Sequence, residues 1–125
     1  NLTDRNALSA LTLRLKSDDG CIVWLNGARV ASRFAPDTPS WNSAATSLTD
    51  DEDALAFESI GIPAGLGSLK DGENVLAIQA LNGSADNQDF LMVPELELRV
   101  YDTATALRMR CRIRSRSNSR PTRNM

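Results

Sequence analysis

Residues 17–30, SDDGCIVWLNGARV, constrain the fold more than any other part of the chain, because two turn signals enclose one short apolar run. Asp18-Asp19-Gly20 supplies side chains that bond their own backbone and a glycine that tolerates positive φ, and Asn26-Gly27 is the favoured two-residue hairpin turn. The run between them is rich in β-branched and aromatic residues and too short for an ordinary helix. The segment predicts a central strand that enters a hairpin, with Trp24 buried in the core.

Alternation elsewhere predicts further strands. Leu11, Leu13 and Leu15 alternate with polar residues, which indicates a half-buried strand with Arg14 and Lys16 in solvent. Other strands are expected at 28–33, 55–62, 75–81 and 90–101, with a bend, a bulge or an edge position at Pro94. Segment 34–53 is expected to be a long loop and 63–72 a glycine-rich turn region. Without a long amphipathic helix, short strands separated by turns predict an all-β sandwich or barrel.

Two motifs resemble those of galactose-binding-like domains, which have an antiparallel jelly-roll β-sandwich fold. The first is Asp18-Asp19-Gly20, a short apolar run and Leu25-Asn26-Gly27, and the second is GENVLAIQALNGSADNQDF at 72–90. Such domains occur in secreted and surface proteins of bacteria, beside catalytic or cell-wall modules. The resemblance covers about 11–100 and implies ligands on loops at one end of the sandwich. Family members often have a histidine after the second strand, but this chain has Leu81-Asn82 there and no histidine anywhere, so no histidine-dependent role is carried over.

The length predicts one β-sandwich domain over 1–102 and an arginine-rich tail over 103–125. All sixteen acidic residues lie at or before Asp102 with seven basic ones, a net charge of −9, whereas 108–125 holds seven arginines and no acid. Such a tail is either a polyanion-binding element or a disordered passenger. Because it lacks aromatic residues for base stacking, nucleic acid is the less favoured partner. Apolar and arginine residues alternate over 107–114, which also fits an added edge strand.

The remaining bulk features exclude little. No apolar stretch approaches the roughly 20 residues of a membrane helix, so no membrane insertion is expected. Cys21 and Cys111 form a disulfide only if their strands adjoin; the alternative is one buried and one exposed thiol.

Catalysis is not expected from this composition. The chain has no histidine, and no Gly-x-Ser-x-Gly motif or phosphate-binding loop appears. Paired carboxylates, as in Asp18-Asp19, are consecutive and lie in turns, where turn formation is the commoner role.

The same acids could instead hold calcium, which prefers several carboxylate and carbonyl oxygens. Asp18 and Asp19 are the candidate ligands, with the acids of 50–53 and 86–89 as others, and the resemblance implies that a structural Ca²⁺ is common. The alternative is that these are solvated turn residues.

Carbohydrate binding needs an exposed aromatic ring to stack on a sugar, with polar groups beside it. Two polar loops fit this description, and the candidate ligand-binding residues are Arg33, Trp41, Asn42, Asn82, Asp86 and Asp89. The alternative for Trp41 is a plug that seals the edge of the core.

We therefore predict a non-catalytic glycan-binding module of a larger extracellular or cell-surface protein, with a possible structural calcium ion. The alternative function is a structural or protein-interaction spacer without a ligand of its own.

Overall fold

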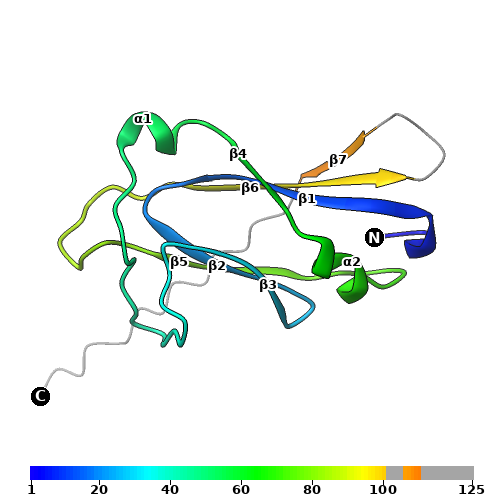
Figure 1. The fold of residues 1–125 in the computed structure, drawn as a ribbon, viewed down its shortest axis with the longest axis horizontal. Helices are drawn as coiled ribbons and strands as arrows, with labels where there is room; N and C mark the ends of the chain where they lie inside the picture. Colours follow the sequence, from blue (N-terminus) through cyan, green and yellow to red (C-terminus); the bar gives the residue numbers. More distant parts are fainter. Residues whose placement is uncertain (101–105, 111–125) are drawn as a thin grey trace, which may run out of the picture.

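Two antiparallel sheets face each other in the computed structural model, which describes residues 1–100 and 106–110 (Figure 1). One sheet has the strand order β4-β1-β6-β7 and the other β3-β2-β5. In chain order the elements are η1 (Arg5–Ala7), β1 (Leu8–Ser17), β2 (Gly20–Leu25), β3 (Ala28–Arg33), α1 (Asp51–Ala54), β4 (Glu58–Gly61), α2 (Pro63–Ser68), β5 (Leu76–Leu81), β6 (Met92–Val100) and β7 (Ala106–Arg110). The expected all-β sandwich is confirmed at this level.

Strand β1 shows the predicted alternation. Leu11, Leu13 and Leu15 are buried against the opposite sheet, as their spacing requires. Arg14 and Lys16 are not in open solvent but half-buried, so that expectation is wrong. Both cations lie over the ring of Phe57, at 4.5 Å for the Arg14 guanidinium carbon and 4.7 Å for the Lys16 nitrogen. The segment before β4 therefore covers the outer face of β1.

Strands β2 and β3 form the predicted hairpin. Asn26 and Gly27 have φ values of 50° and 86°, as a tight turn with two left-handed residues requires. Cys21 is buried in the core, and this burial raises the pKa of its thiol to about 11. The prediction that Trp24 is buried in the core is wrong, because Trp24 is only half-buried. Alternation along β2 places Trp24 on the face opposite the core residues Cys21 and Val23.

Short helices replace parts of the expected loops and strands. The turn region predicted at 63–72 contains α2, which begins with Pro63 at a position where proline is favoured. The strand predicted at 55–62 is shorter, since β4 begins at Glu58 and Leu55 is exposed after α1. Pro94 pairs with Leu15 of β1 within β6, which lies between β1 and β7 in the sheet order, so it is not in an edge strand. The register shift between β1 and β6 lies elsewhere, between Leu8 and Ala10.

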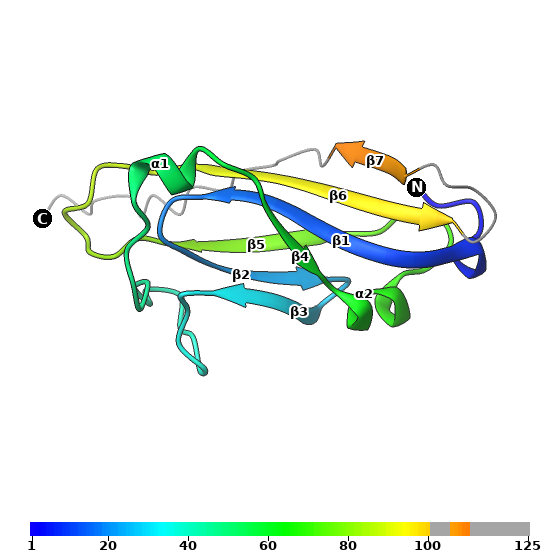
Figure 2. The same cartoon turned by 45° about the horizontal axis from the view of Figure 1, so that its top comes forward.

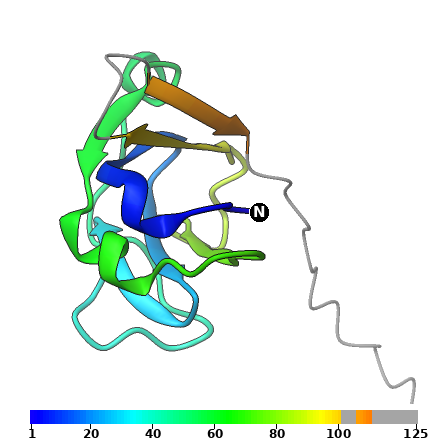
Figure 3. The ribbon, with the colours of Figure 1, turned by 90° about the vertical axis from the view of Figure 1, so that its right-hand side faces the viewer.

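The long connections gather at the two ends of the sandwich (Figure 2). We call the end with the Asn26-Gly27 turn and α2 the hairpin end, and the end with the β1–β2 turn, α1 and the loop 82–91 the loop end. Segment 34–50 runs outside the three-stranded sheet, on the face away from the core (Figure 3). No helix in the described ranges is long and apolar enough to cross a membrane. Cys111, the other cysteine of the disulfide alternative, lies outside the described residues.

Candidate functional site

The turn between β1 and β2 places two adjacent aspartates inside the loop end. Asp18 is 5% exposed and Asp19 is 1% exposed, so neither is a solvated turn residue. Asp19 has a φ of 55°, a left-handed conformation that Asp tolerates better than most residues. The Asp18 backbone N–H donates to the Leu91 carbonyl at 2.8 Å, which fixes the turn against the end of the loop 82–91.

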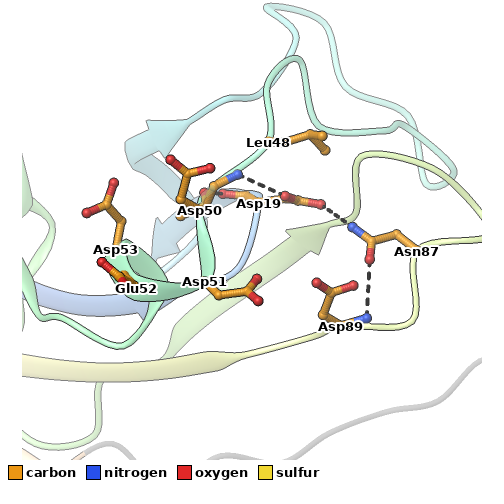
Figure 4. A pocket seen from close by; sticks show the side chains of 9 residues that line it. Asp19, Leu48, Asp50, Asp51, Glu52, Asp53, Asn87 and Asp89 are labelled. Carbon is orange, nitrogen blue, oxygen red and sulfur yellow. Dashed lines mark hydrogen bonds between the residues drawn. The ribbon is translucent and has the colours of Figure 1, made fainter.

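The Asp19 carboxylate connects three loops. Its Oδ1 accepts a hydrogen bond from the Thr49 N–H at 3.1 Å, and its Oδ2 accepts from the Gly83 N–H at 2.7 Å. Its Oδ2 also accepts from Asn87 Nδ2 at 2.9 Å (Figure 4). The Thr49 hydroxyl also donates to the Asp19 carbonyl at 3.2 Å. Three donors to one carboxylate make strong, charge-assisted bonds. The loops 34–50 and 82–91 are therefore joined at the same end of the sandwich.

Above this carboxylate lies an open depression of about 560 Å³, which we call the acidic cleft. Figure 4 shows carboxylates from α1 and from the loop after β5 gathered around it. Its lining residues are Asp19, Leu48, Thr49, Asp50, Asp51, Glu52, Asp53, Asn87 and Asp89. No lysine or arginine is among these lining residues, so the cleft carries a concentrated negative charge.

A second depression of about 280 Å³ adjoins the acidic cleft and shares Asp51 and Asp89 with it. The buried Asp18 lines it together with the apolar side chains of Leu55 and Phe90. Burial raises the pKa of Asp18, and the neighbouring carboxylates of Asp19, Asp89 and Asp51 raise it further. An ionised Asp18 would thus gain from a cation placed in this depression.

The calcium hypothesis stays a prediction. Three donors already occupy the Asp19 oxygens. In the part of the chain that the structure describes, no group of three or more His, Cys, Asp or Glu residues has an arrangement that could hold a metal ion. The structure brings acids of all three predicted clusters into one region, but Asp18 and Asp19 face different surroundings.

Trp41 lies on the surface, and its interpretation as a core plug is wrong, since its side chain is 84% exposed. The backbone beside it is fixed: the Ser40 N–H donates to Ser43 Oγ at 2.8 Å, and Gln79 Nε2 of β5 donates to the Ser40 carbonyl at 2.8 Å. Asn42 is exposed next to the indole, and its Oδ1 accepts from the Ser40 hydroxyl at 2.8 Å. The ring is thus presented to solvent on an ordered loop.

Arg33, the last residue of β3, has partners on the opposite, four-stranded sheet. Its guanidinium donates to Ser17 Oγ at 3.0 Å, forms an ion pair with Glu58 of β4 at 3.1 Å, and lies 4.8 Å from the ring centre of Phe34. These contacts join the edge strands β3 and β4 across the open side of the sandwich. Arg33 therefore has a structural task, which the sequence did not indicate.

The predicted site residues of the loop 82–91 have different surroundings. Asn82 is tied to segment 34–50, because its carbonyl accepts from the Ala45 N–H at 2.8 Å, and its Nδ2 donates to the Asn87 carbonyl at 3.2 Å. Asp86 is exposed. Asp89 is exposed and lines both depressions, so it belongs to the acidic region. The apolar members Leu48, Leu55 and Phe90 were not among the predicted site residues, because isolated apolar residues in loops carry no periodic signal.

Comparisons with known proteins add no family to this description. No protein-family model matches the sequence, and searches of curated proteins and of solved structures find no significant match. The functional hypotheses therefore depend on the residues and geometry of this chain.

Proposed function

We propose that the domain is a non-catalytic carbohydrate-binding module of the galactose-binding-like jelly-roll type, carried by a larger extracellular or cell-surface protein. The observation that carries this proposal is the 84% exposure of Trp41. A large aromatic ring that is open to solvent and does not seal the core offers a flat apolar face, which suits the apolar face of a pyranose.

Order in the surrounding loop supports the same proposal. The Gln79–Ser40 bond anchors the loop to β5, and the Ser40–Ser43 bond closes a small turn around Trp41 and Asn42. A binding loop that is already ordered loses less conformational entropy when a ligand binds. The exposed amide of Asn42 offers a donor beside the indole for a sugar hydroxyl.

Structural calcium is a separate part of the proposal. If the acids of the loop end hold Ca²⁺, a chelator should lower Tm and added Ca²⁺ should restore it, because a ligand bound only by the native state stabilises it by mass action.

A spacer or protein-interaction domain is the second candidate. The exposed side chains of Leu48, Leu55 and Phe90 beside the acidic cleft favour it, since apolar groups rimmed by charge are typical of docking surfaces.

The test begins with a glycan array that covers plant, algal and bacterial wall polysaccharides, probed with the wild-type chain. On the polysaccharide that is retained, Trp41→Ala should weaken binding by at least about tenfold, equivalent to ~1.4 kcal/mol. Its free energy of unfolding should change by no more than about 0.5 kcal/mol, as for other surface positions.

Phe90→Ala is the matched control, because Phe90 is also an exposed aromatic residue, at 60%. It lies at the second depression and should leave glycan affinity unchanged. An array without any retained glycan, or equal affinity of Trp41→Ala and wild type, would contradict the carbohydrate proposal and favour the spacer.

A further inference from the structure

Both tryptophans of the chain lie on the outer side of the three-stranded sheet, away from the core. Trp41 belongs to segment 34–50, which runs outside this sheet (Figure 3). Ile22, on the outer face of β2, is 0% exposed, so this part of the face is covered. Two residues later Trp24 is open in part, and its β5 partner Ala77 is exposed. The outer face is therefore accessible at Trp24.

A β-bulge places a cation beside Trp24. The register of β2 and β3 shifts between Val23 and Trp24, so that Val23 lies opposite Ala31 but Trp24 lies opposite Arg29. Without this shift Val30 would lie opposite Trp24. Opposite residues of an antiparallel pair share one face of the sheet, and bulges often redirect a side chain at a functional position. Arg29 therefore shares the outer face with the indole.

The charge of Arg29 is held in place but not paired. Its Nη1 donates to the Asp37 carbonyl at 3.0 Å, which ties the exposed side chain to segment 34–50. Within 1–100 and 106–110 the ion pairs use Arg14, Arg33 and Arg99, and Arg29 takes part in none of them. A guanidinium has five N–H donors, so enough remain for two parallel hydrogen bonds to an external carboxylate.

The loop that carries Trp41 is anchored next to the row of Trp24. The Ser40 carbonyl accepts from Gln79 Nε2 at 2.8 Å. Gln79 is two residues from Ala77, which lies opposite Trp24, and two residues span about 7 Å along a strand. The two rings and the cation thus belong to one surface.

We propose that Trp24, Arg29 and Trp41 form one extended site for an internal stretch of a polysaccharide that contains uronates, the carboxylated sugars. This inference rests on the proposed carbohydrate function and adds the class of glycan. The two indoles stack on separate sugars of the chain, and the Arg29 guanidinium binds a uronate carboxylate. A neutral polysaccharide lacks the group that Arg29 recognises.

The first experiment measures affinity for polygalacturonate, for alginate and for the methyl esters of both, which keep the sugar but lose the charge. It uses about 150 mM salt, which screens repulsion from charges farther away than roughly 8 Å. Wild type should bind at least one of the two polyuronates and should bind its methyl ester at least about tenfold more weakly, as expected for loss of a bidentate charge-assisted contact.

Arg29→Gln should bind the polyuronate and its methyl ester with nearly equal affinity. Arg5→Gln is the matched control, because Arg5 Nη1 also donates to a backbone carbonyl, that of Leu69, at 3.0 Å. Arg5 belongs to η1 and not to the outer face, so its replacement should leave the preference for the polyuronate intact.

A charge added beside the site gives a second test. Ala77→Glu places a carboxylate on the face of Trp24 and Arg29, and should weaken polyuronate binding by at least about tenfold. Ala77→Gln adds a side chain of the same size without the charge, and should weaken it distinctly less. Position 77 is exposed, so both variants should keep the wild-type Tm.

The length of the ligand tests the part of Trp24. Wild type should bind a hexamer of the retained uronate at least about tenfold more tightly than the dimer, because the hexamer reaches both rings. Trp24→Leu keeps an apolar side chain on the face and should remove most of this advantage. Equal affinity of wild type for hexamer and dimer would overturn the extended site.

Two other results would overturn the inference and leave the proposed function standing. One is retention of neutral glycans alone, dependent on Trp41 but not on Arg29. The other is equal affinity of wild type for each polyuronate and its methyl ester. If no glycan of any class is retained, the proposed function fails and the inference fails with it.

Discussion

The two ends of the sandwich are each organised by one turn residue with positive φ, but the chemistry differs. At the hairpin end Asn26 Nδ2 donates to the Ser68 carbonyl at 2.7 Å and to Asn74 Oδ1 at 2.8 Å, and its Oδ1 accepts from the Val75 N–H at 2.9 Å. At the loop end Asp19 accepts from the segments on either side of it. One end is closed by a neutral amide and the other by a carboxylate.

The amide and the carboxylate leave different net charges at the two ends. An amide both donates and accepts, so the hairpin end satisfies its backbone groups without a net charge. A carboxylate only accepts, so the loop end gathers N–H donors and keeps a negative charge, to which Asp18, Asp51 and Asp89 add. The loop end is therefore the end whose negative potential would attract a positively charged group.

Replacing Asp19 should have the largest effect. Asp19→Ala removes three charge-assisted hydrogen bonds, leaves partly buried donors unpaired and places Ala at positive φ, so the free energy of unfolding should fall by about 3–5 kcal/mol. Urea unfolding measures it. Asp19→Asn is the matched control, because Asn tolerates the same φ and keeps one acceptor oxygen. Its free energy of unfolding should fall distinctly less than that of Asp19→Ala. Equal losses would mean that the carboxylate is not what joins the loops.

Replacing Asn26 should have a smaller effect. Asn26→Ala loses three neutral hydrogen bonds on a half-exposed residue, which we expect to lower the free energy of unfolding by about 2 kcal/mol. Asn26→Asp keeps the acceptor for the Val75 N–H but not the donors, and should fall between Ala and wild type. A loss larger than that of Asp19→Ala would reverse the comparison between the ends.

Asp18→Asn should have the smallest effect, with the opposite sign. Because the pKa of Asp18 is raised above its ordinary value of 3.8, the folded state holds this proton more tightly than the unfolded state. The stability linked to Asp18 is then present below about pH 3.8 and is lost as the pH rises through the folded pKa. Asp18→Asn should raise Tm at pH 7, and the gain should shrink toward pH 3.5.

Thermal melts at pH 7 and pH 3.5 measure the gain in Tm. A gain that is equal at both pH values would be due to packing and not to the ionisation of Asp18.

Local signals predicted much of the fold. The hairpin follows from two adjacent residues, Asn26 and Gly27, and the burial of β1 follows from its alternating leucines. The run around Trp24 was apolar on both faces, so alternation could not tell which face the opposite sheet covers. The short helix α2 was missed because two glycines among its six residues give a turn signal that tertiary contacts outweigh.

The candidate site was less accessible to sequence. The partners of Asp19 lie 30, 64 and 68 residues away, and no local pattern connects positions so distant. The acids were recognised as separate clusters, and their gathering at one end was not predicted. The division of tasks between Asp18 and Asp19 depends on which of them meets the donors of Gly83 and Asn87. That distinction is a property of the assembled loop end.

Because Cys21 is buried between the sheets, the rate at which its thiol is alkylated reports how often the domain opens. With a pKa of about 11, almost none of it is thiolate at neutral pH, and alkylating reagents attack the thiolate. Alkylation of Cys21 then requires the two sheets to separate, so its rate depends on how often they do so. The same protein unfolded in urea supplies the reference rate, and the ratio of the two rates reports how often the core is exposed.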